Sequence, residues 1–457
     1  MTVETRTINA NESNLLTNQN ATKNDLLKFG DKLNDMRRHI FDELIDFHML
    51  VKENTNIIEL DKIMKTFNKE LSITTILNQT KMKSNIYQIS LIISIFLFSC
   101  NPDAAKHTDN KVDTNDKLAL RIAGYDYDRV RAIMDGKIEH EGLNTSFNVE
   151  NIYNLNAAAF GPEKKYDVTE IGLIPFITKY INDDFRDYTL IPVFISRTFR
   201  HRNIFVHVDS GIEKPEDLIG KKVGTPGYGM SANTWIRGFL LDEYGVKASD
   251  MHWIETTKSS DGGKLNTDLG KYYFEDDFPL IKGPENVDES ELLISGQCDA
   301  LITAITPKAF LEGNPKIKRL FQNVKETEIA YFKNTNMFPI MHVVAIRTDV
   351  LEENPWLAKT VFDIYSEAKN IAYKKLESTT VLSVTLPWTS DEFESTRELM
   401  GNNYWKYGTE ANRKELEAIM RYVFEQGLVK RQITFEELFD PTTLELKEDL
   451  GDTLETE

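Results

Sequence analysis

The chain has 457 residues, and its 54 Lys and Arg against 72 Asp and Glu leave a formal net charge of −18. Such an acidic chain does not supply the clustered cations that neutralise phosphates, so nucleic acid is excluded as a leading partner. Hydrophobic residues make up 41% and charged residues 28%, and this length predicts two or three folding units with a sizeable core. The two cysteines, Cys100 and Cys298, are too few for a disulfide scaffold or a CxxC-type metal site.

An apolar run extends from Ile86 to Phe98, after lysines at 81 and 83 and before Cys100. It is shorter than the roughly 20 apolar residues that span a bilayer, so it is typical of the core of a secretory signal. Its ending, LFSC, resembles a bacterial lipobox, although Phe98 is an unusual occupant. We therefore expect a lipoprotein-like signal over 82–100 with lipidation at Cys100, followed by a polar linker over 101–117.

Residues 1–81 precede this signal, although a signal acts only at an N-terminus. Either the chain starts at Met82 and 1–81 is an artefact of gene prediction, or 1–81 is real and the apolar run is an internal helix. Residues 1–24 are rich in Asn and Thr and read as disordered, whereas 26–77 has the spacing of a helical appendage. The first interpretation predicts a lipid-anchored protein of the cell envelope that faces the periplasm. The second predicts a cytoplasmic protein.

From Leu118 onward the sequence alternates between strand and helix patterns. We predict a strand over 118–123, a helix over 127–134, a strand with its turn over 167–173, and a pair of strands over 191–194 and 204–208. A short helix opened by Pro215 then leads to a buried strand over 221–225. The alternation predicts an α/β fold with mostly parallel sheets.

A loop over 227–231, with glycines at 227 and 229, precedes a helix expected over 232–244, with Ser231 as its N-cap. A helix that begins in such a loop offers free backbone N–H groups and the positive end of its dipole to an anion. The loop is therefore either an anion site, with Tyr228 and Ser231 beside the ligand, or an ordinary capped helix.

The residues from 191 to 246 carry a family resemblance; they read IPVFISRTFRHRNIFVHVDSGIEKPEDLIGKKVGTPGYGMSANTWIRGFLLDEYGV. This run resembles the 4,5-dihydroxyphthalate decarboxylase family, and the likeness covers roughly 118–440. It continues in LLISGQCDALITAITP (292–307), MFPIMHVVAIRTDVLEENPWLA (337–358), LPW (386–388), MGNNYWKYG (400–408) and RYVFEQGL (421–428).

The resemblance implies the two-lobed type II periplasmic-binding-protein-like fold, in which the chain crosses twice between lobes and the ligand lies in the cleft between them. By that resemblance lobe 1 is 118–207 with 334–441, and lobe 2 is 208–333. The acidic tail from 442 to 457 is expected to be disordered beyond 444. The segment 256–283 has no readable period and is either a lid on lobe 2 or a surface loop.

Cationic side chains gather at the first expected crossing: Arg197, Arg200, His201 and Arg202. Arg237 lies two residues after Trp235 on the helix that follows the glycine loop. Arginine pairs with a carboxylate through two parallel hydrogen bonds, and an aromatic ring supplies an apolar wall. We therefore expect Arg197, Arg200 and Arg237, with Trp235, to contact the ligand. The alternative is that the cations form a solvated edge.

Three residues are candidates for acid–base chemistry. His201 and His342 occupy the two crossings and are expected to face each other across the hinge; the alternative for each is a core histidine. Glu170, in DVTEIG, stands at a strand end and is the best carboxylate candidate. We rank the proton donors as His201, His342 and then Glu170, because the histidine pKa lies near neutrality, whereas a glutamate needs a raised pKa to carry a proton there.

The decarboxylation that the resemblance implies needs a base and an acid but no cofactor. The sequence shows no HExxH, Cys/His cluster, acidic calcium loop or G-x-G-x-x-G after a strand, although a metal held by distant carboxylates stays open. Two classes of function remain. One is a carboxy-lyase acting on a hydroxylated aromatic carboxylate. The other is a lipid-anchored receptor for a small anionic or aromatic ligand, partnered by an ABC-type permease.

If Cys100 is lipidated, Cys100→Ala releases the protein from membranes or leaves its unprocessed form, because a stable anchor requires more than one acyl chain. Incorporation of radiolabelled fatty acid into the wild-type chain, and its loss in the variant, checks this. A wild-type chain that takes up no label contradicts it.

Overall fold

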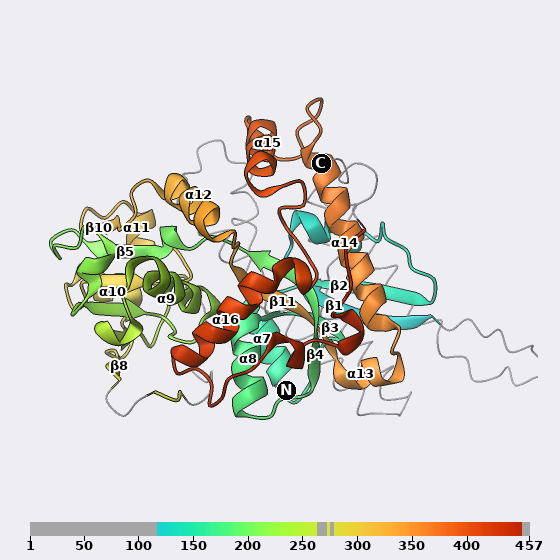
Figure 1. Cartoon of the computed structure of the whole chain (residues 1–457), viewed down its shortest axis with the longest axis horizontal. Coiled ribbons are helices and arrows are strands. Elements are labelled where there is room, and N and C mark those ends of the chain that lie inside the picture. The colour runs from blue at the N-terminus through green and yellow to red at the C-terminus, as the bar shows by residue number, and fades with distance from the viewer. Residues whose placement is uncertain (1–116, 263–271, 275–277, 450–457) are drawn as a thin grey trace, which may run out of the picture. The chain divides into compact units, whose positions relative to one another are not determined.

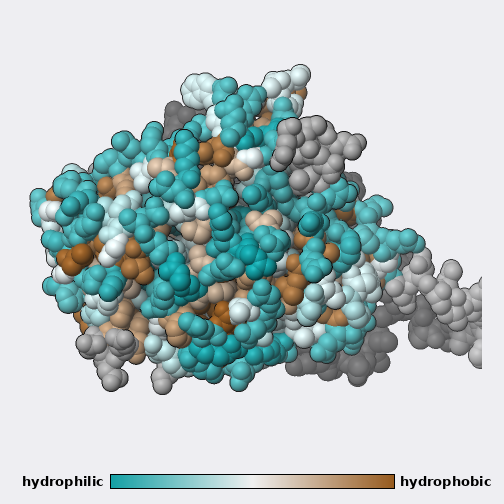
Figure 2. All heavy atoms as spheres, in the orientation of Figure 1, coloured by the Kyte–Doolittle hydropathy of each residue, from teal (hydrophilic) through white to brown (hydrophobic). Residues whose placement is uncertain are grey.

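The computed structural model describes residues 117–262, 272–274 and 278–449. The expected extension 1–81, the signal with Cys100, and the linker as far as 116 lie outside the described residues. Within the described ranges, no helix is long and apolar enough to cross a membrane. Hydrophilic side chains cover most of the face shown in Figure 2, with apolar side chains scattered between them.

Two sheets organise the described residues (Figure 1). The first has the order β2-β1-β3-β11-β4. Its strands are β1 (Leu118–Gly124), β2 (Leu143–Val149), β3 (Val168–Gly172), β4 (Tyr188–Arg197) and β11 (Ile340–Arg347). β1 is parallel to β2 and β3, whereas β11 inserts antiparallel between β3 and β4.

The second sheet has the order β10-β5-β9-β6-β7-β8. Its strands are β5 (Ile204–His207), β6 (Lys222–Thr225), β7 (His252–Glu255), β8 (Leu280–Lys282), β9 (Ala300–Ile302) and β10 (Ile317–Arg319). β6 is parallel to β7 and β9, and β5 is antiparallel to β9 and β10. The first sheet receives β11 after the chain returns from the second sheet, and all strands of the second sheet lie between the two crossings, which confirms the expected two-lobed α/β fold.

We define lobe 1 as 117–197 with 340–449, and lobe 2 as the described residues of 204–335. The first crossing lies at 198–203, before the expected boundary at 207, because β5 pairs with β9 and β10 of lobe 2. For the same reason the predicted pairing of 191–194 with 204–208 is wrong: β4 and β5 belong to different sheets.

Helices flank both sheets, with α14 beside the first and α9, α10 and α11 around the second (Figure 1). Those of lobe 1 are α6 (Arg131–Met134), α7 (Ile152–Phe160), α8 (Leu173–Asn182), α13 (Thr348–Glu353), α14 (Leu357–Leu376), α15 (Thr389–Met400) and α16 (Arg413–Glu425). Those of lobe 2 are α9 (Ser231–Tyr244), α10 (Glu289–Ile294), α11 (Lys308–Leu311) and α12 (Val324–Thr335).

Short 3-10 turns complete the described secondary structure. They are η2 (Asp128–Val130), η3 (His201–Asn203), η4 (Pro215–Leu218), η5 (Ala248–Asp250), η6 (Glu410–Asn412), η7 (Phe435–Glu437) and η8 (Pro441–Thr443). The helix predicted over 127–134 is therefore a 3-10 turn followed by α6. Ser231 is the first residue of α9, and Met230 before it is the N-cap, so the N-cap prediction is wrong by one residue.

The helices α9 of lobe 2 and α16 of lobe 1 pack against each other. A Cβ on Gly238 would lie 2.3 Å from the ring of Tyr422, so only glycine allows this close approach. Asp242 accepts hydrogen bonds from the Tyr422 hydroxyl at 2.5 Å and from Arg421 at 2.6 Å. These contacts fix the two lobes to each other along one side.

The start of the acidic tail is packed rather than disordered. Leu444 and Leu446 pack on the core, and Glu448 forms an ion pair with Lys369 at 2.5 Å in which both side chains are at most 3% exposed. The expectation of disorder from 444 onward is therefore wrong for 444–449, because a buried lysine on α14 requires a carboxylate partner. Residues 450–457 lie outside the described part of the chain.

Candidate active site

Glu170 is the centre of a hydrogen-bonded cluster in lobe 1. It lies in β3, and the residue is 1% exposed. Its carboxylate accepts hydrogen bonds from the Tyr125 backbone N–H at 3.0 Å and from the Tyr127 hydroxyl at 2.9 Å. The third partner is Nδ1 of His342, 2.6 Å from Oε1. A buried carboxylate requires such partners, and these three satisfy it.

The end of β1 explains how the carboxylate reaches the backbone. A Cβ on Gly124 would lie 3.1 Å from Oε2 of Glu170, so a glycine here leaves room for the carboxylate beside the next N–H group. Burial and the nearby Glu170 carboxylate raise the pKa of Tyr127. The Tyr127 hydroxyl therefore stays protonated and acts as a donor.

His342 stands on β11 at an irregularity of the sheet. It pairs with Ser196 of β4, whereas Val344 pairs with Ile191, so residues 192–195 stand opposite the single residue 343. Bulges of this kind change the direction of side chains and recur near active sites. When Nδ1–H of His342 donates to the Glu170 carboxylate, Nε2 is the ring nitrogen left for other partners. The His342 side chain is 18% exposed, so it is not fully enclosed by protein.

Arg200 lies beside this cluster at the first crossing. Its Nε contacts the sulfur of Met341 at 3.3 Å, and its Nη1 donates to the carbonyl of Ala304, in lobe 2, at 3.0 Å. Burial lowers the pKa of Arg200 to about 10, which leaves it charged at neutral pH. No carboxylate of the described residues lies within ion-pair distance of it, although the charge of Glu328, which pairs with Arg202, acts to raise its pKa.

Groups of lobe 2 approach the same cluster. Burial, together with the carboxylates of Glu170 and Asp261, raises the pKa of Tyr125. Asp261 belongs to the loop after β7 of lobe 2, so acidic and phenolic groups of both lobes lie near each other here. Within the described ranges, no group of three or more His, Cys, Asp or Glu side chains is arranged to hold a metal ion.

His201 does not face His342. Its ring stacks on Phe239 at 4.2 Å and meets Phe321 and Tyr331, and the residue is 1% exposed. Burial lowers its pKa to about 4, and its Nδ1 has no hydrogen-bond partner. The expectation that His201 is the first-ranked proton donor is contradicted, because a neutral core histidine carries no proton to give at neutral pH.

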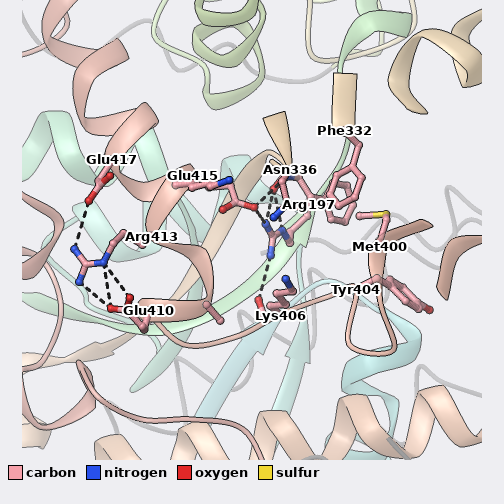
Figure 3. Close-up of a pocket in the computed structure, with 13 residues that line it drawn as sticks. Arg197, Phe332, Asn336, Met400, Tyr404, Lys406, Glu410, Arg413, Glu415 and Glu417 are labelled. Atoms are coloured by element: carbon pink, nitrogen blue, oxygen red, sulfur yellow. Dashed lines mark hydrogen bonds and ion pairs between the residues drawn. The ribbon is translucent and has the colours of Figure 1, made fainter. Parts of the chain in front are cut away.

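Arg197 is not a free clamp either. Its guanidinium donates to Glu415 at 2.8 Å, to Asn412 at 2.6 Å and to the carbonyls of Phe338 and Lys406. It lies in the wall of a pocket of about 350 Å³ between α12 and α16, drawn in Figure 3. Glu170, Arg200 and His342 do not line this pocket. Arg197 therefore holds the second crossing, at 336–339, through the Phe338 carbonyl, and its guanidinium is already engaged, which does not support the expected role as a ligand clamp.

The other predicted binding residues join the lobes or fill the core. Trp235 donates through Nε1 to the carbonyl of Ile340 at 2.8 Å. Arg237 is 1% exposed and donates through Nε to Gln426 of lobe 1 at 2.7 Å. The Ser231 hydroxyl accepts from the Ile174 N–H of lobe 1 at 3.3 Å. These contacts engage all three side chains within the protein, while Nη1 of Arg237 is buried without a hydrogen-bond partner.

Tyr228 is buried beneath part of the segment predicted as a lid or a surface loop. Its ring meets Tyr272 at 5.6 Å, Phe274 at 5.2 Å and Phe278 at 5.5 Å, edge to face. The aromatic group of this segment therefore packs into lobe 2 and holds the glycine loop. Residues 263–271 and 275–277 lie outside the described part of the chain.

Sequence reasoning missed Tyr125 and Tyr127. Both lie in GYDYDRV, directly after β1, and both supply donors to Glu170. The signal that could have found them is their position directly after β1. Parallel strands end at the same edge of a sheet, so residues that follow β1 lie close to those at the end of β3.

These features define a two-lobed type II periplasmic-binding-protein-like protein with a carboxylate–histidine pair and an unpaired arginine close to the crossings. The chain belongs to the 4,5-dihydroxyphthalate decarboxylase family, as its sequence had indicated. It is 34% identical over 331 residues to the 4,5-dihydroxyphthalate decarboxylase of Comamonas testosteroni, covering 72% of this chain and 98% of that relative. The protein of the same name from Pseudomonas putida is 34% identical over 207 residues, 45% of this chain and 78% of that relative.

Two further comparisons are broader. The NMT1/THI5 like family matches residues 194–269. Among solved structures, the periplasmic aliphatic sulphonate binding protein SsuA from Escherichia coli has a TM-score of 0.42 at 16% identity, covering 70% of this chain and 97% of that one. The desulfurization enzyme DSZB has a TM-score of 0.39 at 13% identity, covering 71% and 97%.

The burial of His201 predicts an acid sensitivity of the fold. Because burial lowers its pKa from 6.5 to about 4, the stability it confers is present above pH 6.5 and is lost as the pH falls towards 4. At 1.36 kcal/mol per pKa unit this amounts to about 3 kcal/mol. His201→Phe keeps the stacking and removes the titration, so its free energy of unfolding in urea is expected to fall less between pH 7 and 4 than that of the wild type.

The control is His252→Gln, which changes an exposed histidine of β7. Its pH dependence is expected to match the wild type. Equal losses in the wild type and His201→Phe contradict the assignment.

Proposed function

We propose that the chain is a carboxy-lyase that removes one carboxylate from a hydroxylated aromatic dicarboxylate without oxidation. The observation that carries this proposal is the Glu170–His342 pair, in which Nδ1 is tied to a buried carboxylate and Nε2 is the exchanging nitrogen. Family membership supports the same reaction class, since the relatives in Comamonas testosteroni and Pseudomonas putida are named for it. 4,5-Dihydroxyphthalate is the first substrate to test.

The chemistry follows from the ring. In 4,5-dihydroxyphthalate one phenol stands para to the departing carboxylate, so loss of the phenol proton increases the electron density at the ipso carbon. That carbon then accepts a proton, its bond to the carboxylate breaks, and the bonding electrons return to the ring as carbon dioxide leaves. One acid and one base suffice for these transfers. We assign the proton that reaches the ipso carbon to Nε2 of His342.

Glu170 makes His342 suitable for this task. It orients the ring through Nδ1, and its negative charge stabilises the imidazolium that exists before the proton is delivered. Tyr127 and the Tyr125 N–H hold the carboxylate in place, so the pair does not have to reorganise during the reaction.

Arg200 is proposed to bind the carboxylate that is retained. Its guanidinium bonds to neutral groups only, Met341 and the Ala304 carbonyl, and Met341 directly precedes His342. A charge buried without a counterion is costly, and a ligand carboxylate would supply the missing partner. The anchoring cation thus contacts the residue that directly precedes the proton carrier in the chain.

The second candidate is a lipid-anchored receptor that binds a small anionic or aromatic ligand for an ABC-type permease. The apolar run 86–98 and Cys100 favour it, and the corresponding location would be the periplasmic face of the cell envelope. Incubation of the full chain with 4,5-dihydroxyphthalate separates the two functions. Release of carbon dioxide supports the carboxy-lyase, and binding without turnover supports the receptor.

Glu170→Gln and His342→Gln are expected to lower kcat by roughly 10²–10⁴ and to leave KM nearly unchanged, because proton transfer acts in the transition state. Progress curves at several concentrations of 4,5-dihydroxyphthalate provide the measurement, with His252→Gln as the control histidine. Full activity in both variants removes the pair from the mechanism. Loss of affinity with unchanged turnover would assign the pair to ligand binding.

Arg200→Ala is expected to weaken binding of the aromatic dicarboxylate by about 2 kcal/mol, roughly 30-fold, because a desolvated carboxylate loses its charged partner. Arg200→Lys recovers part of the loss, since an ammonium lacks the planar fork. Isothermal titration at fixed pH measures both. Arg202→Lys, on a half-exposed arginine paired with Glu328, is the matched control and leaves affinity unchanged. Wild-type affinity in Arg200→Ala rules out the clamp.

A further inference from the structure

Arg129 is stacked between two aromatic rings next to the candidate site. Its guanidinium carbon lies 3.9 Å from the ring centroid of Tyr127 and 4.1 Å from that of Trp405. Its Nε donates to the carbonyl of Ile195 at 2.7 Å, and its side chain is 13% exposed. Cation–π attraction holds such a planar group between two ring faces. The Tyr127 ring is therefore supported on one side by a fixed cation.

The far side of this stack is fixed as well. Trp405 donates through Nε1 to the carbonyl of Phe194 at 2.9 Å, and its backbone N–H group donates to the Tyr373 hydroxyl at 2.8 Å. Its carbonyl accepts from the buried ammonium of Lys369 at 2.8 Å. Every hydrogen-bonding group of Trp405 is thus engaged, and its ring offers Arg129 a rigid face.

The bulge of β4 supplies the acceptors for this arrangement. Residues 192–195 stand opposite the single residue 343 of β11, so their backbone groups cannot all pair across the sheet. The carbonyl of Phe194 accepts from Trp405 and that of the next residue, Ile195, accepts from Arg129. The irregularity that accompanies His342 on β11 therefore also anchors the two residues of the stack.

We propose that Arg129 is a positioning residue of this site. By fixing the Tyr127 ring it holds the Tyr127 hydroxyl on Glu170, 2.9 Å away, and through Glu170 it keeps His342 oriented. Arg129 acts through Tyr127, because its own Nε bonds to Ile195 and its described ion pair is with Asp128. The kinetic part of this inference rests on the proposed function; the hydrogen-bond geometry does not.

A double-mutant cycle tests this role. Arg129→Lys removes the planar group that stacks, and we expect kcat on 4,5-dihydroxyphthalate to fall roughly 10- to 100-fold with KM within about twofold. Tyr127→Phe removes the hydroxyl and is expected to lower kcat as well. In the Tyr127→Phe background the Arg129→Lys change should have no further effect, because its only route to Glu170 is already lost. Additive losses overturn the proposal.

A second measurement does not depend on turnover. The Nδ1–H proton of His342, observed by NMR in the full chain with labelled histidine and assigned with His342→Gln, reports the bond to Glu170. Arg129→Lys and Tyr127→Phe are each expected to shift this signal, and the double variant to match Tyr127→Phe alone. A chain that shows these shifts but releases no carbon dioxide supports the positioning role and refutes the proposed function.

Arg131→Lys is the matched control, since Arg131 lies two residues further and pairs with Asp126 at the surface. It should leave both kcat and the His342 signal as in the wild type. An unchanged His342 signal in Arg129→Lys, with urea unfolding showing an intact fold, overturns the proposal. Arg129→Gln, which removes both the guanidinium and its charge, serves as the second variant and should lower kcat and shift the His342 signal at least as much as Arg129→Lys does.

Discussion

The mismatch between β4 and β11 is the constraint on which this site depends. Pro192 has no N–H to give to a neighbouring strand, and proline inside a sheet occurs at bulges or edges. Here β4 carries residues 192–195 opposite one residue of β11, which ends regular pairing next to His342. The freed carbonyls bind Gly408, Trp405 and Arg129. The irregular part of β4 thus lies beside His342, and its carbonyl groups bind residues of the C-terminal part of lobe 1 next to it.

The lobes meet through contacts that do not depend on a ligand. Gly238 lets α9 approach Tyr422 of α16, Asp242 receives two donors from α16, and Arg237 bonds to Gln426. These are close polar and steric contacts between lobe 2 and the C-terminal helix of lobe 1. Arg200 contacts both lobes, so these contacts also fix its distance from Glu170 and His342 in lobe 1. A site held in this way before binding favours reactions that require exact placement of a proton carrier.

Sequence reasoning named Glu170, His342 and Arg200, but it did not foresee that Arg197 and Arg237 are engaged by partners within the protein. Glu170 and His342 were predicted because strand ends and crossings place residues at the junction of the lobes in this fold. Arg197 and His201, three and one residues from Arg200 and just as close to that junction, have structural roles. Arg197 meets Glu415, which is 218 positions away, and His201 meets the rings of α9 and α12. Local pattern shows the type of a side chain, whereas its partner is decided by tertiary packing. The packed tail was missed for the same reason, since Glu448 depends on Lys369.

The contrast between Arg197 and Arg200 argues for the kind of ligand. Both lie at the first crossing, and burial lowers the pKa of each. Arg197 has a carboxylate at 2.8 Å and stabilises the fold, whereas Arg200 bonds directly only to a sulfur and a carbonyl and feels the Glu328 carboxylate from beyond ion-pair distance. An arginine that served stability alone would gain from a neighbouring carboxylate, because unpaired buried charge is costly. A ligand carboxylate would add the direct ion pair that Arg200 lacks, which is the role proposed for it.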